Sequence, residues 1–176
     1  LYAYGSYLMP TINPTTADNT AYKTDSTFAG ARDATTATGV YSVSTQSHTY
    51  AVRASYGGRG AGLYFINRAF FSFDTSGISN RPSEGTIKFY GAGAGVVNDG
   101  DAALVKSTHG GGVSTSDFDA IDGWVSGADN RGNVTFYANL VTAGNWSHNS
   151  YNVMQLNNAA LERMADHTSL QCCLMN

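Results

Sequence analysis

The sequence predicts an all-β domain, an antiparallel β-sandwich of the jelly-roll type with one or two short helices. Apolar and polar residues alternate with period two in several short segments, which is the period of side chains along a strand. Turns rich in Gly, Ser and Asn separate these segments. The sequence shows no strand–helix–strand alternation of the kind that builds a parallel α/β sheet. With 176 residues, the chain suits one large sandwich domain.

The composition favours a folded domain with an uncharged polar surface. Charged residues make up 13% of the chain, about half the usual share, and hydrophobic residues make up 42%. Disorder normally combines low hydrophobicity with high net charge, and here the net charge is only -3. The Lys and Arg residues form no basic patch for nucleic acid. No apolar run approaches the roughly 20 residues that cross a bilayer, so we predict no membrane insertion.

The N-terminal part of the chain shows little periodicity. Residues 1–14 are rich in Tyr and Pro and predict a strand or an arm that leaves the domain, so that residues 15–176 form the sandwich itself. Residues 15–38, rich in Thr, Ala and Asp, predict a long surface loop with one helical turn at Phe28–Arg32. Because the chain lacks an initiator Met and stops directly after an apolar segment, we expect it to be a piece of a longer polypeptide.

The strongest strand prediction covers residues 63–73. Leu63, Phe65, Asn67, Ala69, Phe71 and Phe73 fall on one face, and Tyr64, Ile66, Arg68, Phe70 and Ser72 on the other. Aromatic residues on both faces indicate a central strand that is packed on both sides. The sequence Asp74-Thr75-Ser76-Gly77 then predicts a turn.

Further strands and helices follow from the same patterns. The other predicted strands are residues 48–56, Thr86–Tyr90, 102–107, 133–137, 151–156 and 170–175. Ser114 is placed to cap a short helix over residues 116–121, and Asn157 or Asn158 to cap one over residues 159–165. Cys172 and Cys173 are adjacent on a strand and therefore point to opposite faces, so we predict two ordinary small side chains rather than a disulfide.

Three motifs in the middle third of the chain resemble a known family. Residues 68–78 carry Arg-x-Phe-Phe-Ser-Phe-Asp-Thr-Ser-x-Ile, Thr86–Tyr90 runs into Gly91, and residues 116–119 read Ser-Asp-Phe-Asp. This pattern resembles a β-sandwich family of virion surface proteins and secreted polysaccharide-associated proteins, whose fold is like that of carbohydrate-binding modules. We interpret the motif physically as follows: Phe70, Phe71 and Phe73 fill the core between two sheets, and Asp74 and Thr75 accept backbone hydrogen bonds in the turn.

The sequence departs from the family pattern at two places. Members have Pro directly after the Ile, whereas Ser79, Asn80 and Arg81 precede Pro82 here, so this loop is expected to be reshaped. Members also continue to one more closing strand, so the domain is predicted to be truncated before that strand or completed by a neighbouring subunit. An open sheet edge is a template for strand pairing, which suits an assembly protein.

Exposed aromatic side chains are the candidate ligand-binding residues. Sugar-binding sandwiches stack sugar rings on Trp and Tyr. The candidates are Tyr56 and Tyr64 near a glycine-rich turn, and Trp124 and Trp146 in loops. A Trp in a loop also serves as a plug over the end of a core, and this alternative stays open.

A structural Ca²⁺ is the one cofactor that the sequence suggests. Asp99 and Asp101 lie in Asn98-Asp99-Gly100-Asp101, which is part of a calcium loop without the distant Glu. The same residues also suit a tight hairpin turn. Asp117, Asp119 and Asp122 surround a predicted helix start, where carboxylates are favoured without a metal.

Motifs that belong to enzymes are incomplete in this sequence, so we predict that the protein is not an enzyme. His109-Gly110-Gly111-Gly112 is similar to an esterase oxyanion loop, but the sequence lacks the Gly-x-Ser-x-Gly nucleophile motif with which such a loop acts. Gly91, Gly93 and Gly95 lack the rest of a dinucleotide fingerprint. Glu84 and Glu162 are the only Glu residues, and neither is placed for a glycosidase pair.

The sequence therefore predicts a structural protein of a virion surface: a capsid decoration, fibre or spike-base domain. It would contact copies of itself or other virion proteins, and its location would be the virion surface or the extracellular space. The alternative is a carbohydrate-binding module of a secreted or cell-surface protein that binds glycans.

Overall fold

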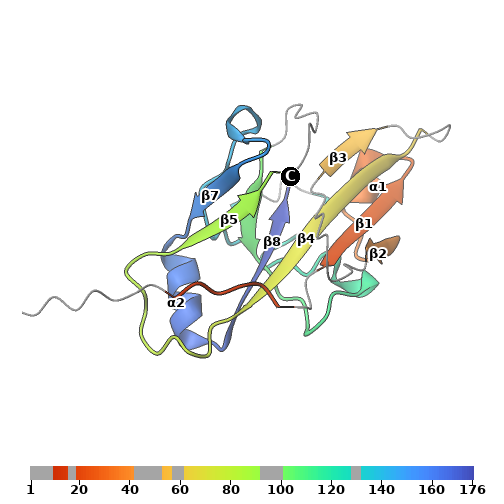
Figure 1. Ribbon diagram of the computed structural model, residues 1–176. Coiled ribbons are helices and arrows are strands. Elements are labelled where there is room, and N and C mark those ends of the chain that lie inside the picture. The colour runs from red at the N-terminus through yellow and green to blue at the C-terminus, as the bar shows by residue number, and fades with distance from the viewer. Residues whose placement is uncertain (1–9, 16–18, 42–52, 57–61, 92–100, 128–131) are drawn as a thin grey trace, which may run out of the picture.

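The computed structural model describes residues 10–15, 19–41, 53–56, 62–91, 101–127 and 132–176 (Figure 1). These residues form an all-β protein with two antiparallel sheets and short helices, as predicted. The strands are β1 (Asn19–Asp25), β2 (Gly39–Tyr41), β3 (Arg53–Tyr56), β4 (Tyr64–Asp74), β5 (Thr86–Tyr90), β6 (Ala103–Lys106), β7 (Tyr151–Gln155) and β8 (Ser169–Met175). The α-helices are α1 (Phe28–Arg32) and α2 (Asn158–Asp166). Neither has the length and apolar character that a membrane crossing requires.

The larger sheet is built around β4. Its order is β2-β1-β4-β8-β6, and β3 also pairs with β4. The N-terminal half of β4 lies between β1 and β3, and its C-terminal half pairs with β8 through Phe70↔Cys173 and Phe71↔Cys172. The smaller sheet contains β5 and β7, paired from Thr86↔Gln155 to Tyr90↔Tyr151.

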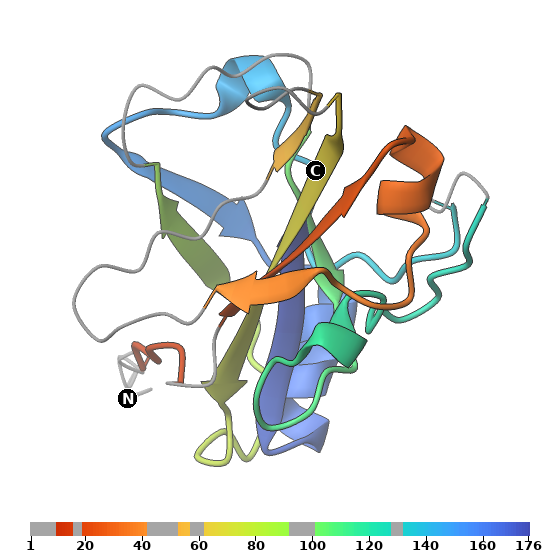
Figure 2. The same ribbon diagram turned by 90° about the vertical axis from the view of Figure 1, so that its right-hand side faces the viewer.

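The prediction that β4 is packed on both faces is confirmed. One face of the larger sheet packs against the smaller sheet and α2, and this core includes Ala69, Phe71, Leu104, Cys172 and Met154. The opposite face packs against α1 and the segment around Phe118 and Ile121, and this second core includes Ile66, Phe70, Val105 and Cys173. Figure 2 shows the larger sheet between these two layers.

The family-like segment is arranged partly as expected. Phe71 and Phe73 lie between the two sheets, but Phe70 is on the opposite face, in the second core. Asp74 Oδ1 accepts a hydrogen bond from Ser76 N at 2.9 Å, as predicted. Thr75 also accepts a backbone hydrogen bond, from Ile78 N to its carbonyl at 2.9 Å. Its hydroxyl donates to the His167 carbonyl at 2.8 Å, which ties the end of β4 to the residue that follows α2.

The two cysteines behave as the strand pattern predicts. Cys172 and Cys173 are not joined by a disulfide, both are fully buried, and they belong to opposite cores. Burial raises the pKa of the Cys173 thiol to about 12, so this thiol stays protonated at neutral pH.

The prediction of a long surface loop over residues 15–38 is wrong. Asn19–Asp25 forms β1 and pairs with β4 over seven positions, from Asn19↔Phe70 to Asp25↔Tyr64. The segment alternates poorly because both its faces are partly covered, and the pairing with β4 determines its structure more than its own pattern does. The helical turn predicted at Phe28–Arg32 is confirmed as α1, which Thr27 caps by accepting a hydrogen bond from Gly30 N.

Two further predictions are corrected in detail. The helix expected over residues 116–121 is a 3₁₀ turn, Thr115–Asp117, where Ser114 and Asp117 form a capping box. The strand expected over residues 133–137 appears as single bridges, Val105↔Phe136 and Ala138↔Leu156. This segment contacts β6 on one side and the end of β7 on the other, so it connects the two sheets instead of running along one of them.

Other predicted elements are found near their expected bounds. The strand at Thr86–Tyr90 is β5, and those at 102–107, 151–156 and 170–175 correspond to β6, β7 and β8. The helix at 159–165 is α2, with Asn157 as its cap. The strand at 48–56 is described only over its last four residues, as β3. Residues 1–9 of the predicted arm lie outside the described residues, and Pro14 forms a bridge with Phe73.

Candidate functional site

The structure separates the four aromatic residues that the sequence singled out. Tyr56 and Tyr64 are cross-strand partners on β3 and β4, and the Tyr64 ring is half-buried with its edge contact to Phe28 at 5.9 Å. Trp124 is half-buried against the second core, while Trp146 is half-buried against the core between the sheets. Tyr64 also packs against the second core, so Trp146 lies on the opposite side of the larger sheet from Tyr64 and Trp124, and these three rings do not form one binding surface.

Trp124 is engaged by a buried arginine. The Arg68 guanidinium lies between two rings, 4.1 Å from the centroid of Trp124 and 4.2 Å from that of Phe118. It donates to the carbonyl of Phe118 at 2.5 Å and to that of Arg32 at 2.9 Å. This arrangement joins β4, the end of α1 and the 118–124 segment. Trp124 therefore covers the buried Arg68 guanidinium and has a packing role, which is the alternative that the sequence left open.

The turn that carries Trp124 depends on Gly123. Its φ is +80°, and a Cβ at this position would collide with the Asn133 carbonyl oxygen. Only glycine fits such a close backbone approach in the left-handed region. The position of Trp124 over Arg68 therefore follows from the local backbone.

Only one of the two proposed cation ligands lies among the described residues. Asp99 lies outside the described residues, and Asp101 is half-buried at the start of the segment that leads into β6. Within the described part of the chain, His, Cys, Asp and Glu side chains form no group of three that would hold a metal ion. The calcium site therefore stays a prediction.

His109, from the glycine-rich motif, forms a buried cluster with two serines. The Ser107 hydroxyl donates to the Ala120 carbonyl at 2.7 Å, so His109 Nδ1, 2.7 Å from the same oxygen, is the donor to it. His109 Nε2 then accepts from the Ser72 hydroxyl at 3.0 Å. Both ring nitrogens of His109 are engaged within the protein, and His109 is only 2% exposed, so this cluster fastens the loop to β4.

The outer side of the smaller sheet carries exposed aromatic residues that the sequence reasoning missed. Tyr90 is 56% exposed and Tyr151 is 63% exposed, and the two are cross-strand partners with ring centroids 5.3 Å apart. Next to them lie Lys88 and Val153, also paired across the strands. We call these four residues the tyrosine face. The signal was present in the sequence, because the alternation in Thr86–Tyr90 places Ile87 and Phe89 inward and Lys88 and Tyr90 outward.

The backbone under the tyrosine face is held by a buried side chain. Asn152 is 5% exposed and lies between Tyr151 and Val153 in sequence, pointing inward. Its amide accepts from Ser147 N at 2.7 Å and donates to the Ser147 carbonyl at 2.9 Å. The segment that leads into β7 is thereby fixed, and the face is preorganised.

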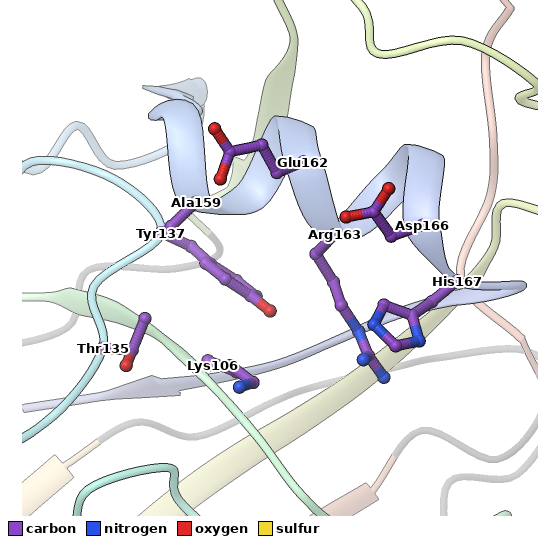
Figure 3. A pocket seen from close by; sticks show the side chains of 8 residues that line it. All are labelled: Lys106, Thr135, Tyr137, Ala159, Glu162, Arg163, Asp166 and His167. Atoms are coloured by element: carbon purple, nitrogen blue, oxygen red, sulfur yellow. The ribbon is translucent and has the colours of Figure 1, made fainter.

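A pocket of about 210 Å³ lies beside α2, where the helix approaches β6 and the 134–138 segment (Figure 3). Its lining includes basic, acidic and hydroxyl side chains: Lys106, Thr135, Tyr137, Arg163, Asp166 and His167. Figure 3 shows the Tyr137 hydroxyl directed between the Lys106 and Arg163 side chains. Burial raises the pKa of Tyr137 above its ordinary value, so the hydroxyl keeps its proton and serves as a donor.

In comparisons with known proteins, no family model, no curated protein and no solved structure matches this chain.

Proposed function

We propose that this protein is a structural component of a virion surface, a jelly-roll-type sandwich that acts through contacts with copies of itself and with other virion proteins. The virion assignment is supported by the motif resemblance over residues 68–78, which form much of β4 and its turn. The role in assembly is supported by the tyrosine face, which is the single observation that carries the proposal.

The tyrosine face has the character of a protein contact surface. Interface cores are enriched in Tyr and depleted of charge. Lys88 is the only charged residue of the four, and its apolar stem lies beside Val153, which is 53% exposed. Exposed apolar side chains that gather on one rigid strand pair indicate a partner more strongly than the same side chains scattered singly.

A second copy of the chain is the partner that suits this face best. Among the described residues, β5 and β7 form a sheet of two strands, so each has a free edge. Free edges are templates for strand pairing. A two-fold contact requires only that the patch is complementary to itself, and a patch of two Tyr and one Val with a single charge is compatible with this.

Sedimentation velocity over a range of protein concentrations tests this proposal. The wild-type chain is expected to associate, and Tyr151→Ser is expected to shift the dissociation constant upward by at least about tenfold, because it removes a large aromatic contact. The matched control is Tyr41→Ser, since Tyr41 is also a strand tyrosine and is 51% exposed. A wild-type chain that stays monomeric at the highest concentrations, or equal effects of the two substitutions, would refute the role of this face.

A carbohydrate-binding module remains the second candidate, and the exposed rings of Tyr90 and Tyr151 favour it. Sugar rings stack on exposed aromatic faces. These two rings are inclined by 75°, so one of them at a time would offer its face to a sugar. A glycan array that shows binding in the wild-type chain and no binding in Tyr151→Ser, with both chains monomeric, would support this candidate over the first.

A further inference from the structure

The pocket beside α2 contains a buried donor that lacks a partner. Tyr137 is 1% exposed, and its hydroxyl makes no hydrogen bond within the described structure. Leaving such a group unpaired costs about 1–3 kcal/mol, and native proteins pair nearly all of them. Figure 3 shows this hydroxyl directed toward the pocket, so a ligand that enters between the Lys106 and Arg163 side chains would supply the acceptor for its proton.

Two cations lie beside this hydroxyl. Lys106 Nζ is held at 3.3 Å from Asp122 Oδ1, and Thr135 donates to the other oxygen of that carboxylate at 2.6 Å. Lys106 is thus fixed in position and still has donors to give, because an ammonium group carries three protons. The Arg163 guanidinium reaches the pocket from α2 and makes no ion pair among the described residues. One oxygen-rich anionic group would therefore meet a hydroxyl, an ammonium and a guanidinium.

The rest of the lining limits the charge and the size of the ligand. Glu162 and Asp166 also line the pocket, so its two carboxylates balance its two cations, and a ligand with several negative charges is disfavoured. Glu162 is turned toward Arg81, at 3.9 Å, whereas the Asp166 carboxylate remains an acceptor for a ligand hydroxyl. A volume of about 210 Å³ is below the roughly 300–1,000 Å³ of sites for drug-sized molecules, so a single small ring fits better.

We propose that this pocket binds a sugar acid, a small ring with one carboxylate and several hydroxyl groups. The carboxylate accepts from the Tyr137 hydroxyl, Lys106 Nζ and the Arg163 guanidinium. A ring hydroxyl donates to Asp166. The site is separate from the tyrosine face, and it would give a virion surface protein a means to recognise acidic glycans.

Titration of the ¹⁵N-labelled full chain, followed by amide chemical shifts, tests this proposal. Sodium glucuronate is expected to give saturable shifts at residues 135–137 and 159–167. Glucose tests the need for the carboxylate, acetate the need for the ring hydroxyls, and inorganic phosphate the preference for one charge. All three are expected to bind at least about tenfold more weakly than glucuronate.

Three variants complete the experiment. Tyr137→Phe and Arg163→Gln are each expected to weaken glucuronate binding by about tenfold or more, since each removes a hydrogen bond to a charged group. Tyr137→Phe retains the ring and removes a buried unpaired hydroxyl, so its thermal stability should equal or exceed that of the wild type. Lys23→Gln, which removes a charge on β1, is the control and should bind normally.

The outcomes divide clearly. Selective glucuronate binding that is lost in Tyr137→Phe and Arg163→Gln supports the proposal. The proposal is overturned by an absence of saturable shifts, by unchanged binding in both variants, or by phosphate or acetate binding as tightly as glucuronate.

Discussion

At the scale of single residues, Arg68 is a charged side chain whose burial costs free energy and whose contacts offset that cost. Burial lowers the pKa of Arg68 to about 10, so the side chain is still charged at neutral pH. Two ring faces and two carbonyl groups replace the water that the guanidinium loses. Its role is therefore to hold three segments together, and a non-polar substitute of similar length would not do this.

Substitution of Arg68 tests that role. Arg68→Met keeps most of the stem but removes two hydrogen bonds from a charged group, each of which contributes about 1.5–3 kcal/mol. We expect a loss of about 3 kcal/mol in the free energy of unfolding, measured by urea denaturation. Arg32→Met is the control, because Arg32 pairs with Asp33 at a partly exposed position. Equal losses in the two variants would contradict the special role of Arg68.

His109 predicts a pH dependence of stability. Burial lowers the pKa of His109 below its ordinary value of 6.5. The unfolded state therefore binds this proton more tightly, so the contribution of His109 is complete above about pH 6.5 and is lost as the pH falls below that value. Asp25, Asp33, Asp74 and Asp122 have lowered pKa values too, but they act only below about pH 4.

Thermal unfolding between about pH 7 and about pH 5 measures this effect. The melting temperature of the wild-type chain should fall over this range. In His109→Gln the slope should be smaller, because the titrating group is gone. A slope that is the same in both chains would show that His109 is not the cause.

Residue roles were only partly predictable from the sequence. The turn role of Asp74 follows from its neighbours, because its hydrogen bond reaches Ser76 two positions away. The role of Trp124 as a cover for Arg68 depends on residues about fifty positions apart, which no local pattern reports. Tyr137 was expected in a strand. The sequence could not predict that its hydroxyl is buried without a partner, because this depends on α2 lying beside β6 in the fold.

At the scale of elements, α2 is fixed by its N-cap. Asn157 Oδ1 accepts from Ala160 N at 3.2 Å, and its Nδ2 donates to the Phe136 carbonyl at 2.7 Å. One side chain thus starts the helix and attaches it to the segment that carries Tyr137. The geometry of the pocket depends on this cap.

Removal of the cap should destabilise the chain measurably. Asn157→Ala removes the capping bond and the bond to Phe136, so we expect a loss of about 1–2 kcal/mol in urea denaturation. Asn158→Ala is the control, since Asn158 accepts only an exposed bond from Arg81, and its effect should stay within about 0.5 kcal/mol. If the control loses as much as Asn157→Ala, the assignment of the cap is wrong.

Elements with strong internal patterns were predicted well, and elements defined by their neighbours were not. The strand Thr86–Tyr90 matches the structure because alternation is a local signal, and the turn at Phe28–Arg32 matches it because the residue that caps it, Thr27, is adjacent in sequence. Strand β1 was missed because its apolar content is low and its pairing partner, β4, begins about forty residues later. The 133–137 segment was predicted as a strand of one sheet, but it forms single bridges because it contacts both sheets.

At the scale of the whole molecule, the larger sheet is the middle layer and keeps its cysteines out of reach. Cys172 and Cys173 are the only cysteines of the chain, and both are fully buried. A cysteine placed on the surface would therefore be the only accessible thiol. Oxidation of a cysteine introduced on the surface can therefore report which surface is in contact between two copies of the chain.

The tyrosine face is the central claim, and Val153→Cys tests it most directly. Val153 lies on the tyrosine face and Val125 lies in a loop that follows Trp124, and each is 53% exposed. Under mild oxidation, we predict that Val153→Cys forms a disulfide-linked dimer while Val125→Cys stays monomeric at the same concentration. Equal cross-linking of the two variants, or none in Val153→Cys, would contradict assembly through this face.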